Sequence, residues 1–223
     1  MNNSKPTLMP KHSRDKDGTI ICFDVETTGL PPPGGLKEPF ELWPHIVQLS
    51  WIKYCPDSQE VCTMRDLIVD PKVTIPPSAC DIHGITNEKA EKEGVSIREA
   101  LHQFFLDCDG CCTVVAHNLN FDMRMVHAEC TRHKLENTLT PIPCRVCTMK
   151  SNIQRCKIEK RSRKGNVYYK YPRLIELHEH LFGRGEYRLH DALVDCILCL
   201  RCYLHIEHGL DIIRLKKFRL ALQ

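Results

Sequence analysis

Runs of apolar residues define the first elements predicted along this chain. Ile20 to Phe23 form a continuous apolar run typical of a strand buried on both faces, and we expect a strand over residues 19–25. Two runs rich in β-branched and aromatic residues, 45–55 and 60–70, are separated by Pro56-Asp57-Ser58-Gln59 and predict a hairpin. The three strands together predict a meander.

From residue 97 onward the hydrophobic pattern alternates between helical and strand spacing. Apolar positions three and four residues apart predict helices, and short apolar runs between them predict strands. The predicted helices are residues 97–107, 121–133 and 189–204, and the predicted strands are residues 111–116 and 142–147. A meander followed by alternating helices and strands indicates an α/β fold, with helices packed on a mixed sheet.

The remaining segments divide the chain into one predicted domain with two short extensions. Residues 1–18 lack periodicity and are expected to form a flexible tail, followed by the domain over residues 19–205 and a basic helix over residues 206–223. Residues 30–44 are rich in proline and glycine and predict a long loop. A chain of 223 residues with 42% hydrophobic content can bury one sizeable core.

Charge and cysteine content bear on the binding partners and the cellular compartment of the protein. The formal net charge is only +3, so attraction to a polyanion must come from local clusters of cations. The chain has 14 cysteines but no visible signal peptide, which favours free thiols in an intracellular, reducing compartment such as the cytoplasm or nucleus. No apolar run approaches the ~18 residues that a membrane span requires, so we expect no membrane association.

Two carboxylates end the first predicted strand. Asp24 and Glu26 are two residues apart, so both side chains project from the same strand face and can converge on one hard divalent cation. An exposed edge strand could carry such a pair by accident, but the apolar run before Asp24 indicates burial. Buried carboxylates need a counter-charge, and the pair therefore predicts a metal site.

Three further candidates follow along the chain. Asp122 comes after the fourth predicted strand in the first turn of a helix, where the helix dipole alone would also favour an acid. His190 and Asp195 are five residues apart, which points them in different directions on a helix. We therefore expect His190 at the junction between a loop and the last helix, with Asp195 on the helix itself. Taken singly, each residue is more often structural than catalytic.

Taken in order, these segments resemble the three motifs of the DEDDh 3′-5′ exonucleases, the proofreading-subunit-like branch of the ribonuclease-H-like superfamily. The segments are Phe23-Asp24-Val25-Glu26-Thr27-Thr28-Gly29, His117-Asn118 through Phe121-Asp122, and His190 with Asp195. The resemblance runs over residues 19–204 and implies a ribonuclease-H-like mixed five-stranded sheet flanked by helices. The long loop at 30–44 and a basic stretch at 157–171 depart from the pattern of the family.

The resemblance also implies a catalytic set and its cofactor. Asp24, Glu26 and Asp195 are assigned to a first metal ion, with Asp24 bridging to a second ion that Asp122 supports. His190 is assigned as the base that deprotonates the attacking water. Because an all-carboxylate site suits hard cations better than zinc, two Mg²⁺ or Mn²⁺ ions are expected.

The activity implied by the family is removal of nucleoside 5′-monophosphates from a nucleic acid 3′ end, with single-stranded DNA favoured. In the family the turn after the first motif receives the terminal nucleotide, so Thr27, Leu30 and Asn118 are candidate substrate contacts, although local turn geometry explains them equally well. An RNA-trimming exoribonuclease and a non-catalytic nucleic-acid-binding module associated with a polymerase are the alternatives. A polymerase partner and the oligomeric state both stay open.

A basic stretch over residues 157–171 adds a candidate nucleic-acid contact. Its cations could pair with phosphates and its tyrosines could stack on unpaired bases. A solvated loop or a nuclear-localisation signal would have the same composition. The residues concerned are Lys157, Lys160, Arg161, Arg163, Lys164, Lys170, Tyr168, Tyr169 and Tyr171.

Overall fold

A five-stranded mixed sheet forms the centre of the protein. The computed structural model describes residues 18–222, without the side chain of Leu36. In the sheet the strands are ordered β3-β2-β1-β4-β5, and β1 pairs antiparallel with β2 but parallel with β4. The strands are β1 (Thr19–Thr27), β2 (Ile46–Cys55), β3 (Glu60–Ile68), β4 (Cys111–Ala116) and β5 (Cys144–Cys147). The predicted meander and the five-stranded sheet are confirmed.

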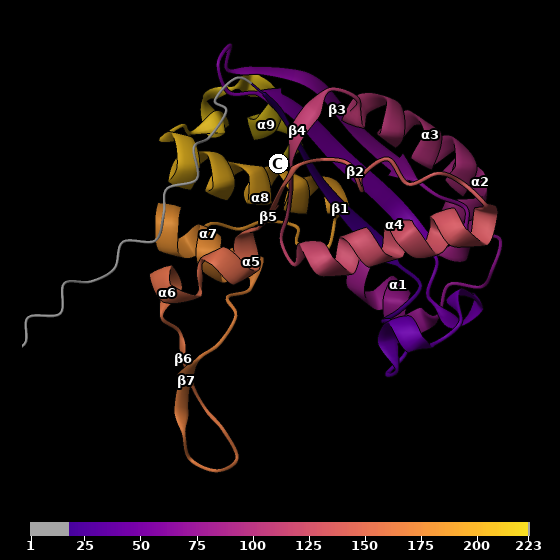
Figure 1. Cartoon of the computed structure of the whole chain (residues 1–223), viewed down its shortest axis with the longest axis horizontal. Coiled ribbons are helices and arrows are strands. Elements are labelled where there is room, and N and C mark those ends of the chain that lie inside the picture. Colours follow the sequence, from indigo (N-terminus) through magenta and orange to yellow (C-terminus); the bar gives the residue numbers. More distant parts are fainter. Residues whose placement is uncertain (1–17, 223) are drawn as a thin grey trace, which may run out of the picture.

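Helices cover both faces of this sheet. In Figure 1, α3 and α4 lie on one side of the strands and α8 lies on the other, which gives three layers. The helices are α1 (Pro77–His83), α2 (Asn87–Glu93), α3 (Ile97–Cys108), α4 (Leu119–His133), α5 (Thr148–Ser151), α6 (Ile153–Cys156), α7 (Leu174–Phe182), α8 (Ala192–His208) and α9 (Lys216–Ala221). None of the described helices is long and apolar enough to cross a membrane.

Strand β1 is buried on both faces because it contributes alternate residues to two cores. Phe23 packs on the side of α3, where its ring centroid lies 5.1 Å from that of Phe104, and Trp51 lies 5.2 Å from the same ring. Cys22 packs on the other side against α8, together with Ile197. This two-sided burial explains the uninterrupted apolar run at the start of the chain.

Local backbone chemistry sets the start of the last long helix. Helix α8 begins at Ala192, later than the predicted 189–204, because His190 adopts a left-handed backbone conformation with φ of 62°. The Asp191 side chain then accepts a hydrogen bond from the backbone N–H of Leu193 at 3.1 Å and caps the helix. Gly209, also left-handed with φ of 68°, ends α8.

The loop over residues 30–44 contains two short 3₁₀ helices, η1 (Gly35–Lys37) and η2 (Phe40–Leu42), and is fastened to α4. Arg132 of α4 donates hydrogen bonds from Nη2 to the carbonyl oxygens of Phe40 at 2.8 Å and Trp43 at 2.9 Å. The loop is therefore held in place although its composition excludes regular helix or strand.

Several short elements were absent from the sequence-based description, among them two helices after β3 and a hairpin. Helices α1 and α2 follow β3 and cover a small apolar cluster that includes Ile75 and Ile85. Both helices have seven residues, which is too short for a clear periodic signal. The basic stretch forms a two-stranded hairpin, β6 (Glu159–Arg161) and β7 (Val167–Tyr169).

The predicted extensions behave differently from one another. The C-terminal segment packs on the domain, with Ile212 and Phe218 inside the core that α8 covers. The tail predicted over residues 1–18 lies outside the described residues except for Gly18. All 14 cysteines are free, among them the buried Cys196, Cys199 and Cys202 of α8, and the reducing compartment stays a prediction.

Replacing Phe104 with alanine is expected to lower the free energy of unfolding by about 3–5 kcal/mol, because the variant leaves a cavity between two buried aromatic rings. Urea unfolding measures the change. Leu106 lies two residues further along α3 and is exposed, so Leu106→Ala is the matched control, with an expected change within about 0.5 kcal/mol. Equal losses in the two variants would contradict the assignment of Phe104 to the core.

Candidate active site

The alternation of β1 carries two carboxylates to the face that α8 covers. Cys22 faces α8, so Asp24 and Glu26, two and four residues further on, project to the same side. The pairing of β1 with β4 runs as far as Cys22, opposite Val115. Beyond that point the edge of β1 is open toward the start of α4.

The first turn of α8 brings Asp195 to this edge. Ligand atoms of Glu26, His190 and Asp195 all lie within 4.8 Å of one another, which makes this group a candidate cation site. His190 stands at the junction before the helix, as predicted, and its side chain is exposed. The structure thus places His190 within ligand distance of the carboxylates, a closeness that the spacing of five residues did not reveal.

Asp122 approaches the same place from α4. The helix begins at Leu119, after Asn118 in the left-handed conformation with φ of 72°, and Asp122 lies in its first turn with only 2% of its surface exposed. Burial raises the pKa of Asp122 well above its usual range, and the charges of Glu26 and Asp195 raise it further. The backbone amides of Val25 and Asp122 partly oppose this rise in pKa.

The four carboxyl groups repel one another in a desolvated space. Burial raises the pKa of Asp24 well above its usual range, with the charges of Asp122, Asp195 and Glu26 adding to the effect. Burial, followed by the charge of Asp195, raises the pKa of Glu26 to about 8. Burial also raises the pKa of Asp195 to about 7. Such a cluster is stable in its ionised form only with a positive charge nearby.

Two oxygens of the cluster have no protein partner. Asp122 Oδ2 and Asp195 Oδ1 are buried, and neither has a hydrogen bond within the described part of the chain. Across residues 18–222, none of the four carboxylates forms an ion pair with a lysine or arginine. Unpaired buried carboxylate oxygens fit a divalent cation, which prefers oxygen ligands.

The predicted substrate contacts border this cluster. Leu30 is 83% exposed in the turn after β1, whereas the Thr27 hydroxyl is already committed to the carbonyl oxygen of Gly29 at 2.6 Å. Asn118 forms the turn before α4 and its side chain does not cap the helix. The roles of Thr27, Leu30 and Asn118 toward a substrate stay predictions.

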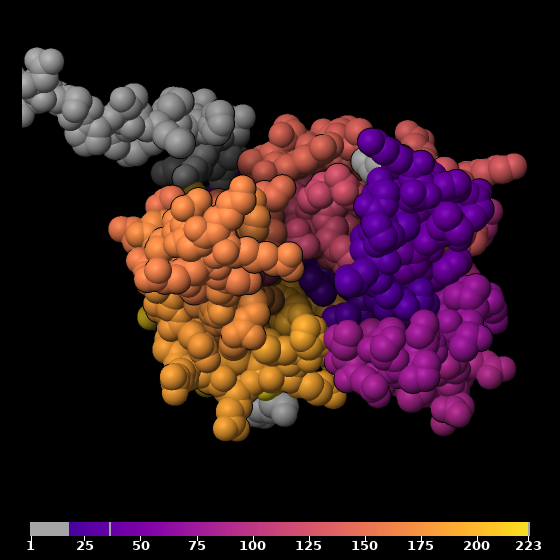
Figure 2. Space-filling view, turned by 90° about the horizontal axis from the view of Figure 1, so that it is seen from below, coloured from indigo at the N-terminus to yellow at the C-terminus, as the bar shows by residue number. Residues whose placement is uncertain are grey.

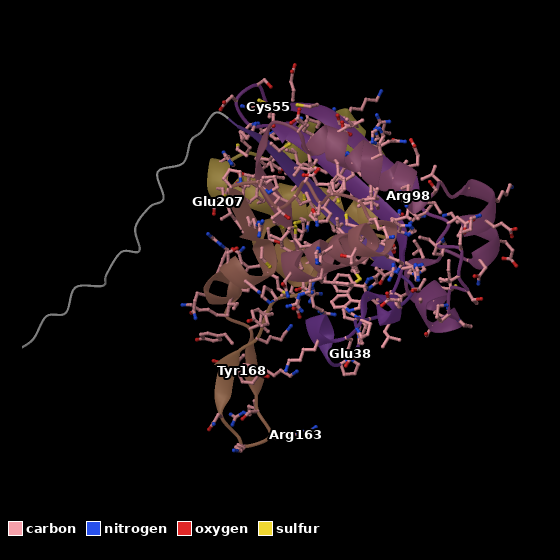
Figure 3. The ribbon with its side chains drawn as sticks, turned by 45° about the vertical axis from the view of Figure 1, so that its right-hand side comes forward. Glu38, Cys55, Arg98, Arg163, Tyr168 and Glu207 are labelled. Atoms are coloured by element: carbon pink, nitrogen blue, oxygen red, sulfur yellow. The ribbon has the colours of Figure 1, made fainter. Side chains whose placement is uncertain are left out.

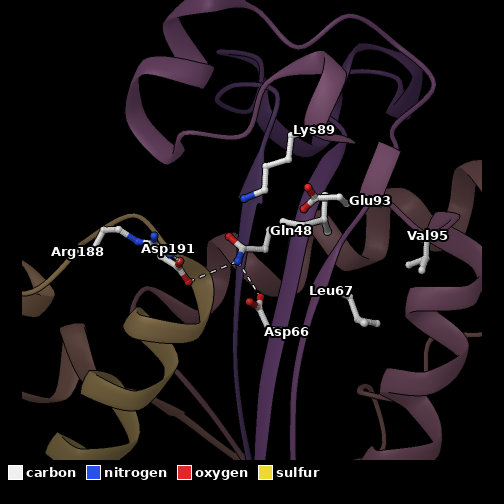
Figure 4. A pocket seen from close by; sticks show the side chains of 9 residues that line it. Gln48, Asp66, Leu67, Lys89, Glu93, Val95, Arg188 and Asp191 are labelled. Carbon is white, nitrogen blue, oxygen red and sulfur yellow. Dashed lines mark hydrogen bonds and ion pairs between the residues drawn. The ribbon is translucent and has the colours of Figure 1, made fainter. Parts of the chain in front are cut away.

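One carboxylate missed in the sequence analysis lies next to His190. The charge of Asp191 raises the pKa of both Glu26 and Asp195. Gln48 of β2 donates from Nε2 to Asp66 at 2.7 Å and to Asp191 at 3.5 Å, and its Oε1 accepts from the backbone N–H of Ala192 at 3.1 Å (Figure 4). The sequence feature that could have pointed to these hydrogen bonds is Gln48, a polar residue within an otherwise apolar part of the second predicted strand.

A cavity of about 350 Å³ opens beside this network. Lys89 and Glu93 of α2 line it, as does Arg188, which pairs with Asp191 (Figure 4). The N-terminus of α8 is therefore held from β2 on one side and from Arg188 on the other. This arrangement fixes the position of the backbone that carries His190.

Two other histidines lie beside residues of the predicted motifs. His117 is tied by Nδ1 to the Thr148 hydroxyl at 2.9 Å and by Nε2 to the carbonyl oxygen of Pro172 at 3.1 Å, and burial lowers its pKa to about 4. His83 accepts a hydrogen bond at Nδ1 from the N–H of Ile85 at 3.1 Å, while its buried Nε2 has no partner among residues 18–222. His83 lies near both Thr27 and His190, and the sequence analysis did not predict this position for His83.

The surface around the site is hollowed. Figure 2, which views the molecule from the side toward which β6 and β7 project in Figure 1, shows a hollow with indigo atoms of the first part of the chain at its floor. Orange atoms of the region around the β6–β7 hairpin and α7 stand on one side of it. Indigo and purple atoms of the segments that follow β1 stand on the other.

Comparisons with known proteins agree with this architecture. The RNase_T family model, described as an exonuclease, matches residues 21–203. A DNA polymerase III subunit epsilon-like protein from Rhodobacter capsulatus is 32% identical over 108 residues, which covers 48% of this chain and 14% of the relative.

Solved structures show the same fold at low sequence identity. Exonuclease I from Methylocaldum szegediense is 18% identical with a TM-score of 0.64, over 91% of this chain and 42% of the other. E. coli Exonuclease I in complex with a dT13 oligonucleotide is 17% identical with a TM-score of 0.63, over 86% and 42%. The chain therefore spans less than half the length of these relatives.

The raised pKa values predict how stability depends on pH without divalent cations. Glu26 and Asp195 keep protons in the folded state that their unfolded forms lose, so the free energy of unfolding is expected to fall as pH rises from about 5 to about 9. Asp195→Asn removes one of the repelling charges and should be more stable than the wild type at pH 9 by about 1 kcal/mol or more. Urea unfolding in EDTA measures both effects.

Addition of Mg²⁺ should stabilise the wild type more than Asp195→Asn, because cation binding to the folded state alone raises its stability. Asp81→Asn, which removes an exposed carboxylate on α1, is the control and should follow the wild type. A wild-type stability that rises over this pH range in EDTA would contradict the carboxylate cluster.

Proposed function

The chain belongs to the RNase_T exonuclease family, and on that premise we propose that it is a metal-dependent 3′-5′ exonuclease that releases nucleoside 5′-monophosphates, with single-stranded DNA favoured. One observation supports the proposal above all others. Four carboxyl groups with raised pKa values, two of them with unpartnered buried oxygens, meet beside an exposed histidine. A purely structural site would pair these charges with lysine or arginine.

The donor set of the site suits two hard cations. Asp24, Glu26 and Asp195 would hold one ion and Asp122 would support the second, with Mg²⁺ or Mn²⁺ favoured because the four side chains offer only oxygen. When bound, such ions neutralise the charge that develops on the attacking and departing oxygens of a phosphodiester.

Residues of the chain itself would carry out the proton transfer. His190 is exposed at the rim of the cluster, so its imidazole can accept a proton from water, as imidazoles do near neutral pH. The left-handed backbone at His190 and the Asp191 cap beside it orient the ring. Asp191 acts in this way as a positioning residue.

A strand that ends at the carboxylates would enter through the hollow of Figure 2. Leu30, 83% exposed in the turn after β1, can pack against the terminal base. Thr27 and Asn118 complete the proposed contacts through the turns that they form.

The preference for single-stranded DNA draws support from the E. coli structure in complex with dT13. A polymerase is kept as a candidate partner because the relative from Rhodobacter capsulatus is named a polymerase III subunit epsilon-like protein.

Wild-type protein with Mg²⁺ or Mn²⁺ is expected to shorten a 5′-labelled single-stranded DNA from its 3′ end, which gel electrophoresis shows as a ladder. EDTA and the substitution Asp195→Ala should each abolish the ladder, because both remove the held cation. Asp81→Ala, on the exposed side of α1, should leave the ladder unchanged. Mononucleotide release from the Asp195→Ala variant at the wild-type rate would refute the proposed site.

A matched RNA strand run in parallel tests the preference for DNA. Faster loss of the RNA would replace the proposal with an exoribonuclease. Binding of either strand without any product would instead favour a non-catalytic binding module.

The substitution His190→Ala is expected to lower kcat by about 10²–10⁴-fold while strand binding is kept, because the variant lacks the proton acceptor. Steady-state kinetics, which separates kcat from KM, measures the effect. His102→Ala, an exposed histidine of α3, is the control. A change in KM alone would assign His190 to binding rather than to proton transfer.

A further inference from the structure

A hairpin projects from the body of the protein at the edge of the candidate site. Strands β6 and β7 form a separate two-stranded sheet, which extends away from the helices in Figure 1. We call residues 157–171 the basic hairpin. Its base is closed by a hydrogen bond from the N–H of Lys170 to the carbonyl oxygen of Ile158 at 2.9 Å, and its tip by one from Ser162 to Asn166 at 2.9 Å.

Four cations on the strands and tip of the basic hairpin are exposed. Across residues 18–222, no carboxylate pairs with any of four side chains on the strands and tip, namely Lys160, Arg161, Arg163 and Lys164. Glu159 is the one acidic residue between 157 and 171. Lys170 at the base, in contrast, pairs with Glu176. The positive charge is therefore concentrated on the part that extends into solvent.

Tyrosines share the hairpin with these cations. Tyr168 is 46% exposed and Tyr171 is 54% exposed, and no described aromatic ring packs on either. Tyr168 pairs across the hairpin with Lys160, which places a cation and a ring side by side on one face. Figure 3 shows Tyr168 along the stem and Arg163 at the tip. A solvated loop has no need of exposed rings at these positions.

The base of the basic hairpin is joined to the site. Pro172 follows the hairpin directly, and its carbonyl oxygen is bound by His117 Nε2 at 3.1 Å. His117 precedes Asn118, which opens the helix that carries Asp122. The hairpin therefore starts at the rim of the hollow in Figure 2 and extends outward from it. Its arm from Lys164 to Lys170 is roughly 20 Å long at about 3.4 Å per residue, enough to follow several phosphates.

We propose that the basic hairpin binds single-stranded nucleic acid upstream of the 3′ end. Lys160, Arg161, Arg163 and Lys164 pair with phosphates, and Tyr168 stacks on an unpaired base. The inference rests on the proposed function for the position of the 3′ end, but strand binding by the hairpin does not depend on cleavage. Phosphates and base faces are common to DNA and RNA, so both are ligands of this surface.

The test compares two variants that each lose four positive charges. The hairpin variant replaces Lys160, Arg161, Arg163 and Lys164 with alanine. The control variant replaces four exposed cations of the C-terminal segment, Arg214, Lys216, Lys217 and Arg219, which lies at the opposite end of the molecule in Figure 1. Because the net charge changes equally, a difference between the variants reports the place of the charge rather than its total.

Affinity is measured by fluorescence anisotropy with 5′-labelled 20-nucleotide and 5-nucleotide strands of DNA and RNA, in EDTA so that no strand is cut. The hairpin variant is expected to bind the 20-mer at least tenfold more weakly, and the slope of log K against log salt should become shallower by about 2 to 3. The control variant should stay within about twofold of the wild type. Equal losses in the two variants, or an unchanged salt slope, would overturn the proposal.

Substitutions at Tyr168 test the stacking. Tyr168→Ala should weaken binding of the 20-mer by about fivefold or more, whereas Tyr168→Phe keeps the ring and should bind like the wild type. A blunt duplex hides its base faces and should not respond to Tyr168→Ala. A loss that is as large with Tyr168→Phe, or as large on the duplex, would overturn stacking.

Cleavage assays separate this inference from the proposed function. If neither variant nor wild type cuts any strand, the proposed exonuclease fails while the binding data still decide the role of the hairpin. If the wild type cuts, the ratio of cleavage rates on the 20-mer and 5-mer should fall in the hairpin variant alone. An unchanged ratio would overturn the hairpin as a contact for the upstream strand.

Discussion

Mutual repulsion among four carboxyl groups in a desolvated space is the constraint on which the rest of this structure depends. Asp24, Glu26, Asp122 and Asp195 come from one strand and two helices, and burial raises the pKa of each. No fold gains stability by gathering these groups alone, because desolvation and like charge both oppose their ionised forms. Bound cations, as proposed for this site, would offset the repulsion.

The scaffold holds these groups against their repulsion by placing β1 at the centre of the sheet, between β2 and β4. Its apolar residues alternate between two cores, one under α3 and α4 and the other under α8. Packing of this kind is close and strongly resists movement, so the strand end cannot shift to relieve the repulsion. Gln48 and Asp191 hold the start of α8 in the same way, through hydrogen bonds to Ala192 and Leu193. Asn118 and His190 adopt strained left-handed backbone conformations, which allow three chain segments to meet at the site.

Around this enclosed centre lie segments that differ in their contacts. The loop over residues 30–44 is tied to α4 by Arg132 and forms one side of the hollow, whereas the basic hairpin extends freely from the other. The centre determines what chemistry the site can perform. The surrounding segments determine which strand reaches it and how firmly that strand is held, and a shared fold therefore does not establish a shared substrate.

The sequence by itself determined the elements with a strong period and the identity of the acidic residues. The apolar run before Asp24 and the alternation of strands and helices predicted a mixed sheet covered by helices, because burial and side-chain direction follow from local spacing. The order of Asp24, Glu26, Asp122, His190 and Asp195 predicted the site through its resemblance to the DEDDh motifs. Short helices such as α1 and α2, and the pairing of β6 with β7, lacked such a period and were not foreseen.

Only the tertiary structure decided which groups meet. Asp191 lies near Glu26 and Asp195, and His83 lies near Thr27 and His190. Gln48 holds the start of α8 through a hydrogen bond to Ala192, 144 positions further along the chain. No local pattern encodes such contacts. The pKa values likewise depend on burial and on charges brought from other elements, and these exist only once the chain has folded.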